Sequence, residues 1–224
     1  MLWAILSGFG IWLLVFLPGA IIGSIFSKYV FRDKPIASAC VTQIMFIVSS
    51  ILVIIFLFRA NFEDFGFILD TYYLFISIAI SAPIAFALSF LSSYILKYEE
   101  FKPPFVPRNV VEWIGISFIL APTGEEIVFR GVFEGYLLLQ NTDMYVSIAI
   151  PAIIFALIHI VPFAKAPKKV MRIVLINAFI LGVLAGYYRA ISKSVVSAIA
   201  IHSIFNIAGF ISEKIHRERR SQRV

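Results

Sequence analysis

The sequence contains a single cysteine, Cys40, among its 224 residues, so no disulfide can form within the chain. No histidine is followed by a glutamate anywhere, which excludes the HExxH motif of zinc proteases. The GxSxG motif that carries the nucleophile of many serine hydrolases is also missing. There is no internal repeat and no low-complexity segment. Any chemistry must therefore be carried by other residue patterns.

Apolar residues dominate the composition: 61% of the residues are hydrophobic, and the mean hydropathy is +0.96. A soluble domain of this length is nearer half apolar, so the excess indicates an integral membrane protein. The apolar stretches are continuous over about 20 residues, whereas the strands of a membrane barrel would alternate over about 10. The sequence therefore predicts an all-α, polytopic transmembrane helix bundle of about seven spans, which forms one domain over residues 1–224.

Seven apolar stretches are near the length of about 17–25 residues that a span needs. The first begins at Leu2 with neither a basic segment before it nor a small-residue cleavage site, so we expect a retained span and not a signal peptide. The fourth stretch is long and interrupted, and a re-entrant piece there would change the count. The stretches run over Leu2–Ser27, Ile36–Phe58, Thr71–Leu96, Trp113–Leu139, Met144–Val161, Ile173–Tyr188 and Val195–Ile211.

Lysine and arginine are distributed unevenly between these stretches. Segments 28–35, 97–112, 162–172 and 212–224 contain 15 of them, whereas segments 59–70, 140–143 and 189–194 contain 3. Basic loops stay on the cytoplasmic side of a membrane, so the distribution predicts an N-out, C-in protein. The same rule explains the net charge of +6, and no nucleic-acid partner is expected.

Two adjacent acids, Glu125 and Glu126, lie inside an apolar stretch, where a charged side chain is costly and by default functional. Glu126 and Arg130 are four residues apart, so they share a helical face and can pair, and Glu134 continues that face. Glu125 is rotated by about 100° around the helix axis from Glu126, so its side chain points in another direction. The alternative interpretation of Glu126, Arg130 and Glu134 is a charge ladder that stabilises the bundle.

The start of this polar helix has two interpretations. Thr123 to Glu126 fits a capping box, which would begin a new helix near Gly124. A helix dipole would then favour ionised carboxylates in its first turn. The alternative is one continuous helix with a kink at Pro122.

Three further polar residues lie in the last spans. His159 ends the fifth stretch, and His202 and Asn206 lie four residues apart on one face of the seventh. Without a function, His159 would be an interfacial side chain, and the other pair would provide hydrogen bonds between helices. With Glu125, the set suits hydrolysis by proton transfer. It also suits zinc, with Glu125, His159 and His202 as ligands, although we expect no cofactor.

These residues form three motifs on separate apolar stretches: EExxxR from Glu125 to Arg130, FxxxH from Phe155 to His159, and HxxxN from His202 to Asn206. In this order they resemble the CPBP family, also called the Abi family, which includes the type II CAAX prenyl proteases. Gly131 directly after the first motif is typical of that family. The resemblance covers a catalytic core of about residues 113–211.

The resemblance implies an intramembrane endopeptidase. Glu125 and His159 would activate the attacking water, His202 and Asn206 would form the oxyanion hole, and Glu126 and Arg130 would support the site. The substrate would be a peptide or membrane protein, with a lipidated C-terminus in the eukaryotic branch. The short chain with compact loops is more similar to the prokaryotic relatives, which implies the plasma membrane. His159 lies about one turn from the basic 162–172 segment, so the positive-inside rule predicts an active site toward the cytoplasm.

Two other functions use the same residues. A non-catalytic immunity or scaffold protein would keep the fold, but it would not need every polar residue of the three motifs. A proton-coupled transporter would use the intramembrane Glu and His residues as a relay. The chain has no paired inverted repeat and no second broken helix, which argues against transport.

Overall fold

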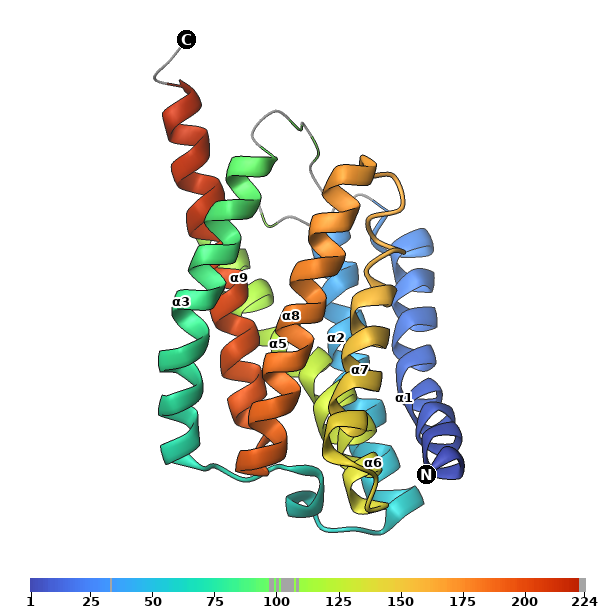
Figure 1. Cartoon of the computed structure of the whole chain (residues 1–224). Helices are drawn as coiled ribbons and strands as arrows, with labels where there is room; N and C mark the ends of the chain where they lie inside the picture. The colour runs from blue at the N-terminus through green and yellow to red at the C-terminus, as the bar shows by residue number, and fades with distance from the viewer. Residues whose placement is uncertain (33, 97–98, 100, 102–106, 108, 222–224) are drawn as a thin grey trace.

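The computed structural model describes residues 1–32, 34–96, 99, 101, 107 and 109–221. Within these ranges all regular structure is helical and no strand occurs. The long helices run side by side, and the chain ends lie at opposite ends of the bundle (Figure 1). The all-α, polytopic bundle that the apolar stretches predicted is confirmed.

The first three stretches form long helices close to the predicted bounds. They are α1 (Leu2–Tyr29), α2 (Pro35–Leu52), which continues as the π-helical η1 (Val53–Phe58), and α3 (Thr71–Ile95). A short 3-10 helix, η2 (Phe62–Phe65), lies in the connection before α3. Asp70 caps α3 by accepting a hydrogen bond from the backbone N–H of Tyr73 at 3.0 Å.

The interrupted fourth stretch is one uninterrupted run of helical residues in which α- and π-helical hydrogen bonding alternate. It consists of α4 (Val110–Glu112), η3 (Trp113–Leu120), α5 (Ala121–Glu126), η4 (Ile127–Glu134) and α6 (Gly135–Leu139). Leu120 already has helical dihedral angles, and the hydroxyl of Thr123 donates to the carbonyl of Ile119 at 2.7 Å. Thr123 is therefore inside the helix, so of the two interpretations the capping box is wrong and the continuous helix is the observed one.

The last three stretches form α7 (Met144–Ile158), α8 (Lys168–Ser192) and α9 (Val195–Ser221). The predicted sixth stretch, Ile173–Tyr188, was too short at both ends. Arg189 had been assigned to an outer loop, but it lies within α8 and is 4% exposed. The last turn of α8 is buried against the bundle and stays helical. The helix ends at Lys193, whose φ of 53° lies in the left-handed region. Arg189 therefore does not contribute to the loop charge.

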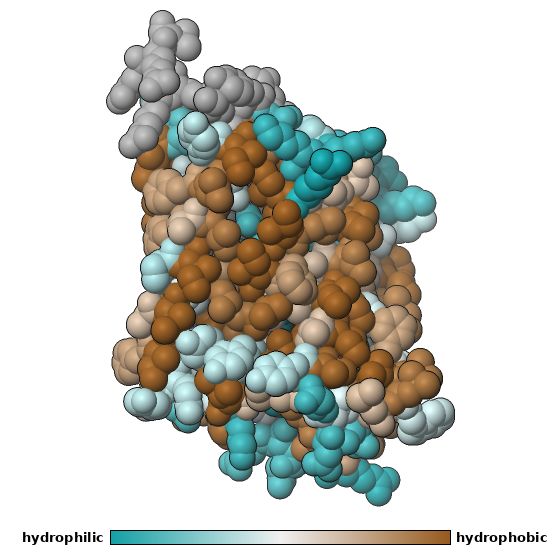
Figure 2. Space-filling view, in the orientation of Figure 1, coloured by the Kyte–Doolittle hydropathy of each residue, from teal (hydrophilic) through white to brown (hydrophobic). Residues whose placement is uncertain are grey.

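The surface agrees with a protein that spans a bilayer. A brown apolar belt lies between two teal polar ends (Figure 2). In the described part of the chain, five helices are long and apolar enough to cross a membrane, and α7 is a shorter apolar helix. The fourth helical run is additional to these. The basic residues of segment 97–112 (Lys97, Lys102 and Arg108) lie outside the described residues.

The helices are held together by an aromatic core and by close approaches at glycines. Rings of α1, α2, η4 and α7 stack on one another; they belong to Trp12, Phe16, Phe46, Phe129, Phe133 and Phe155. A Cβ at Gly19 would overlap the Phe46 ring, and one at Gly23 would overlap Thr42. Small residues thus let α1 and α2 pack backbone to backbone. Between α3 and α8, Asn177 donates to Ser92 Oγ at 2.9 Å.

Candidate functional site

Glu126 lies in a buried ion pair with Arg130. Arg130 Nη1 is 3.0 Å from Glu126 Oε2, and both side chains are inaccessible to solvent. Arg130 Nη2 also donates to the Gly182 carbonyl at 3.0 Å, and its guanidinium lies 4.7 Å from the centre of the Phe155 ring. Because the arginine is held from three sides, the pair has a fixed position. The pairing of Glu126 with Arg130 that the helical spacing predicted is confirmed.

His202 binds the other oxygen of the Glu126 carboxylate. Its Nδ1 lies 2.7 Å from Glu126 Oε1, and the side chain is buried. An ionised carboxylate can only accept, so Nδ1 carries the proton and donates. The ring also meets Phe155 edge to face, with 5.8 Å between centroids. Glu126 therefore connects α5 to α9 and orients the imidazole of His202.

Glu125 is directed away from this ion pair, as its position on the helix predicted. Its Oε1 accepts a hydrogen bond of 2.9 Å from Gln43 Nε2, which comes from α2. Glu125 is partly exposed, whereas Gln43 is buried. The analysis of motifs missed Gln43. Its signal was a glutamine isolated within the apolar stretch 36–58, where polar side chains are costly.

His159 follows the last residue of α7 and occupies the C-cap position. Its Nδ1 lies 2.7 Å from the carbonyl oxygen of Phe155, which can only accept, so Nδ1 carries a proton. In the neutral ring Nε2 is then an acceptor. The His159 ring meets the Phe155 ring edge to face, with 4.9 Å between centroids, and Phe155 meets His202 and Arg130 in turn. Three motifs that lie far apart in the sequence thus meet around Phe155 and Glu126.

Asn206 and Ser203 compensate for the proline in the fourth helical run. Pro122 has no N–H, so the carbonyl that it would bind in the preceding turn loses its helical donor. The carbonyl of Phe118 accepts from Ser203 Oγ at 2.7 Å. The carbonyl of Ser117 accepts from Asn206 Nδ2 at 2.7 Å. Side chains of α9 therefore supply donors to this turn and fix α9 beside the turn that carries the two glutamates.

Two further buried polar residues lie along the same helical face. Glu134 is fully buried, and the buried Arg189 of α8 reaches the next residue, since a Cβ on Gly135 would lie 2.9 Å from Arg189 Nη2. A Cβ on Gly186 would lie 2.8 Å from Glu134 Oε2, and one on Gly182 would lie 3.1 Å from Arg130 Nη2. The two glycines, one helical turn apart, let α8 approach the charged face closely. Sequence analysis missed Arg189 because it was assigned to a loop.

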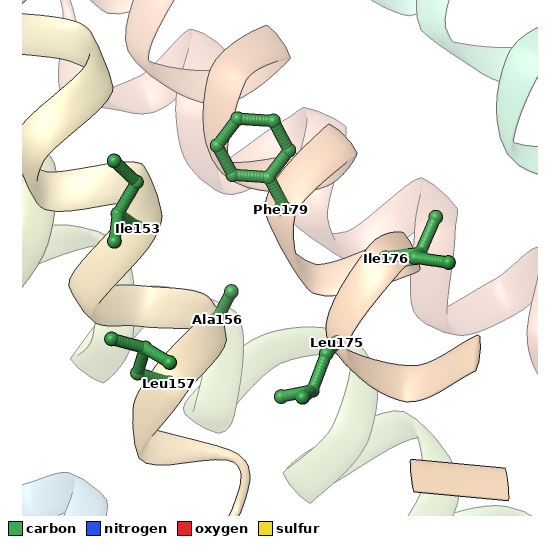
Figure 3. Close-up of a pocket in the computed structure, with 6 residues that line it drawn as sticks. All are labelled: Ile153, Ala156, Leu157, Leu175, Ile176 and Phe179. Atoms are coloured by element: carbon green, nitrogen blue, oxygen red, sulfur yellow. The ribbon is translucent and has the colours of Figure 1, made fainter. Parts of the chain in front are cut away.

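A groove between α7 and α8 lies on the outside of the bundle (Figure 3). Its volume is about 280 Å³, and it is lined by Ile153, Ala156, Leu157, Leu175, Ile176 and Phe179. Ile153, Leu157 and Ile176 are among the exposed apolar residues of the surface. The lining is entirely apolar and includes none of the predicted site residues. The groove therefore presents no side chain that could transfer a proton or bind a metal ion.

Glu125, His159 and His202 are the alternative ligands for zinc. Across the described ranges, no three His, Cys, Asp or Glu side chains are arranged so that they could hold one metal ion. Hydrogen bonds occupy Glu125 Oε1 and the Nδ1 atoms of His159 and His202. The atoms left as zinc donors are therefore Glu125 Oε2 and the two Nε2 atoms, and a catalytic zinc ion takes three protein ligands and a water.

The fold and this site define a class of protein: a polytopic membrane protein with carboxylate and imidazole groups inside its helix bundle. Residues 107–208 match the model of a protein family described as type II CAAX prenyl endopeptidase Rce1-like. The matched segment contains all three motifs and confirms the resemblance to the CPBP family. At the family level it supports a CAAX-type intramembrane protease with a protein substrate in the membrane. Comparisons with curated proteins and with solved structures gave no match.

Proposed function

We propose that this protein is an intramembrane endopeptidase that hydrolyses a peptide bond with a water molecule activated by Glu125 and His159. The observation that carries the proposal is the contrast between two adjacent carboxylates. Glu126 is fully buried between the guanidinium of Arg130 and the imidazole of His202, whereas Glu125 is partly exposed and bound by the neutral amide of Gln43. A general base must be reachable and able to take a proton, which fits Glu125 and not Glu126.

The proposed roles follow from the hydrogen bonds of each side chain. Nε2 of His159 accepts one hydrogen of the water, because Nδ1 is committed to Phe155, and Glu125 takes the other proton. The water oxygen bonds to the carbonyl carbon and the C–N bond breaks. The proton held by Glu125 passes to the leaving nitrogen, which completes the hydrolysis.

His202 and Asn206 are the proposed oxyanion donors. Since Nδ1 of His202 donates to Glu126, its Nε2 can donate to an oxyanion only when the ring carries both protons. The Glu126 carboxylate is a suitable counter-ion for that form, and Arg130 fixes the carboxylate. The Asn206 amide has two N–H bonds, of which one is used by the carbonyl of Ser117. The other is available to the substrate, and such donors are worth about 10²–10³ in rate.

We propose that no metal ion takes part. The amide of Asn206 is a poor zinc ligand but a good oxyanion donor, and the Glu126 carboxylate is already bound by Arg130 and His202, so it is not free to bind a metal ion.

Elemental analysis of the purified, active protein tests the metal-free mechanism. We expect zinc well below one equivalent per chain and activity that survives chelation. One zinc per chain, with activity lost on chelation and restored by zinc, would contradict the mechanism and make Glu125, His159 and His202 the candidate ligands. A matched preparation of Glu125→Gln shows whether any zinc found depends on this residue.

The orientation that we propose is N-out and C-in, in a prokaryotic plasma membrane, with the site toward the cytoplasm. His159 ends α7 beside the basic 162–172 segment, which the positive-inside rule assigns to the cytoplasm. The start of α8 and the short helix η2 lie at opposite ends of the bundle (Figure 1). Exposed residues on these two segments therefore report the orientation.

Single cysteines at Lys168 and Glu63, both exposed, test this orientation in a Cys40→Ala background. An impermeant thiol reagent added from the cytoplasmic side is expected to label Lys168→Cys and to leave Glu63→Cys unmodified. Added from the opposite side, it should do the reverse. Labelling of position 63 from the cytoplasm would contradict the orientation.

The proposed substrate is a peptide or membrane protein, and a lipidated C-terminus is the form that the family suggests. The function is tested with purified protein in proteoliposomes, incubated with transmembrane peptides that do or do not end in a farnesylated cysteine. Mass spectrometry identifies new termini. New termini that depend on Glu125 support an endopeptidase. If every peptide of the set stays intact, the result favours the alternative function, a non-catalytic membrane scaffold.

A further inference from the structure

Gln43 is the polar partner of Glu125, and it comes from outside the segment that matches the family model. It lies on α2, 82 residues before Glu125, and is 8% exposed. Its Nε2 donates to Glu125 Oε1 at 2.9 Å. A buried amide within a membrane span needs a partner, and the carboxylate of Glu125 provides it. The contact therefore joins the first part of the chain to the proposed base.

The packing of α2 fixes the position of this amide. On one side, Gly124 directly precedes Glu125, and a Cβ there would lie 3.0 Å from the backbone oxygen of Gln43. On the other side, Gly23 of α1 lies against Thr42. The hydroxyl of Ser38 donates to the carbonyl of Gly23 at 2.8 Å, which binds α2 to α1 again. The part of α2 that carries Gln43 is thus held between α1 and α5, and at each contact a glycine, Gly23 or Gly124, allows the close approach.

An amide is a better hydrogen-bond partner than a cation for a carboxylate that must act as a base. A cation beside Glu125, such as the one beside Glu126, would stabilise the carboxylate strongly and weaken it as a proton acceptor. The amide fixes the rotamer of the carboxylate through one oxygen and adds no charge. The second oxygen, Oε2, can then take a proton from water.

We infer that Gln43 is a positioning residue for Glu125, so that the α2 helix completes the site. The inference rests on the proposed function, in which Glu125 is the base, but the contact can be measured without any substrate. A hydrophobic carbodiimide reacts with protonated carboxyl groups inside membranes. The rate at which Glu125 is labelled at a fixed pH therefore reports whether Gln43 holds its carboxyl group.

The test compares the full-length protein with Gln43→Leu in proteoliposomes, with labelling of Glu125 located by fragment mass spectrometry. Loss of the charge-assisted hydrogen bond frees the carboxyl group and is expected to speed the labelling of Glu125 by about tenfold. Gln140→Leu, which changes an exposed glutamine, should leave the labelling rate unchanged. Glu126 in the same peptide fragment serves as an internal reference.

Equal labelling rates for the wild type and Gln43→Leu, including no labelling in either, would overturn the inference. If Gln43→Leu does not fold, Gln43→Met gives the same comparison with a more adaptable side chain. The turnover of an identified substrate separates the two proposals. Faster labelling in Gln43→Leu with full activity of Glu125→Gln would retain the contact with Gln43 but refute the proposed function.

Discussion

Glu125→Gln is expected to reduce turnover by about 10²–10⁴-fold, the contribution of a well-placed general base. The substitution keeps the shape of the side chain but removes its ability to take a proton from water. Folding should be preserved, because the position is partly exposed and the side chain of Gln43 can still form a hydrogen bond with an amide. Cleavage rates in proteoliposomes and thermal unfolding of the purified protein measure the two effects separately.

The matched control is Glu63→Gln, which makes the same chemical change at an exposed residue of η2. It should retain wild-type turnover and unfolding temperature. Full activity of Glu125→Gln against an identified substrate would show that Glu125 is not the base. The observed separation of two adjacent glutamates would then have only a structural meaning.

Arg130→Ala is expected to lower the free energy of unfolding by about 3–5 kcal/mol, the usual effect of leaving one charge of a buried pair alone. The arginine is fully buried, and its guanidinium holds Glu126, the carbonyl of Gly182 and the face of Phe155. All three contacts are lost together. Detergent-induced unfolding of the purified protein, with expression yield as a second readout, measures the effect.

Arg32→Ala is the control for this substitution, because it removes an exposed arginine at the end of α1. It should change the stability by less than about 0.5 kcal/mol. Replacing both partners, as in Glu126→Leu with Arg130→Leu, should recover part of the lost stability, since no unpaired charge remains. A stable Arg130→Ala protein would contradict the supporting role of the ion pair.

Much of this architecture is readable from the sequence because a bilayer allows few solutions. Apolar stretches of about 20 residues must be helices, and the predicted bounds of α1, of α2 together with η1, and of α3 differ from the observed ones by two residues or fewer. The helical repeat also predicted the pairing of Glu126 with Arg130 and the separate direction of Glu125. These features depend on local geometry, which one segment of sequence contains.

Contacts between distant helices were not predictable in the same way. Nothing in the spacing of residues shows that Gln43 meets Glu125, because that contact depends on how α2 packs against Gly124. The continuity of the helix through Thr123 also depends on tertiary contacts, since donors on α9 bind carbonyls in the turn before Pro122. A capping motif predicts a helix start only when no other part of the fold supports the longer helix.

The most direct test of the central proposal is peptide cleavage in water enriched in ¹⁸O. Proteoliposomes with wild-type protein and with Glu125→Gln are incubated with the same transmembrane peptides, and the masses of the new C-termini are compared. Hydrolysis by a water molecule activated by Glu125 predicts new carboxyl groups that contain ¹⁸O with the wild type, formed about 10²–10⁴-fold more slowly with the variant. New termini formed at equal rates by both proteins, or by neither, would contradict an endopeptidase that depends on Glu125.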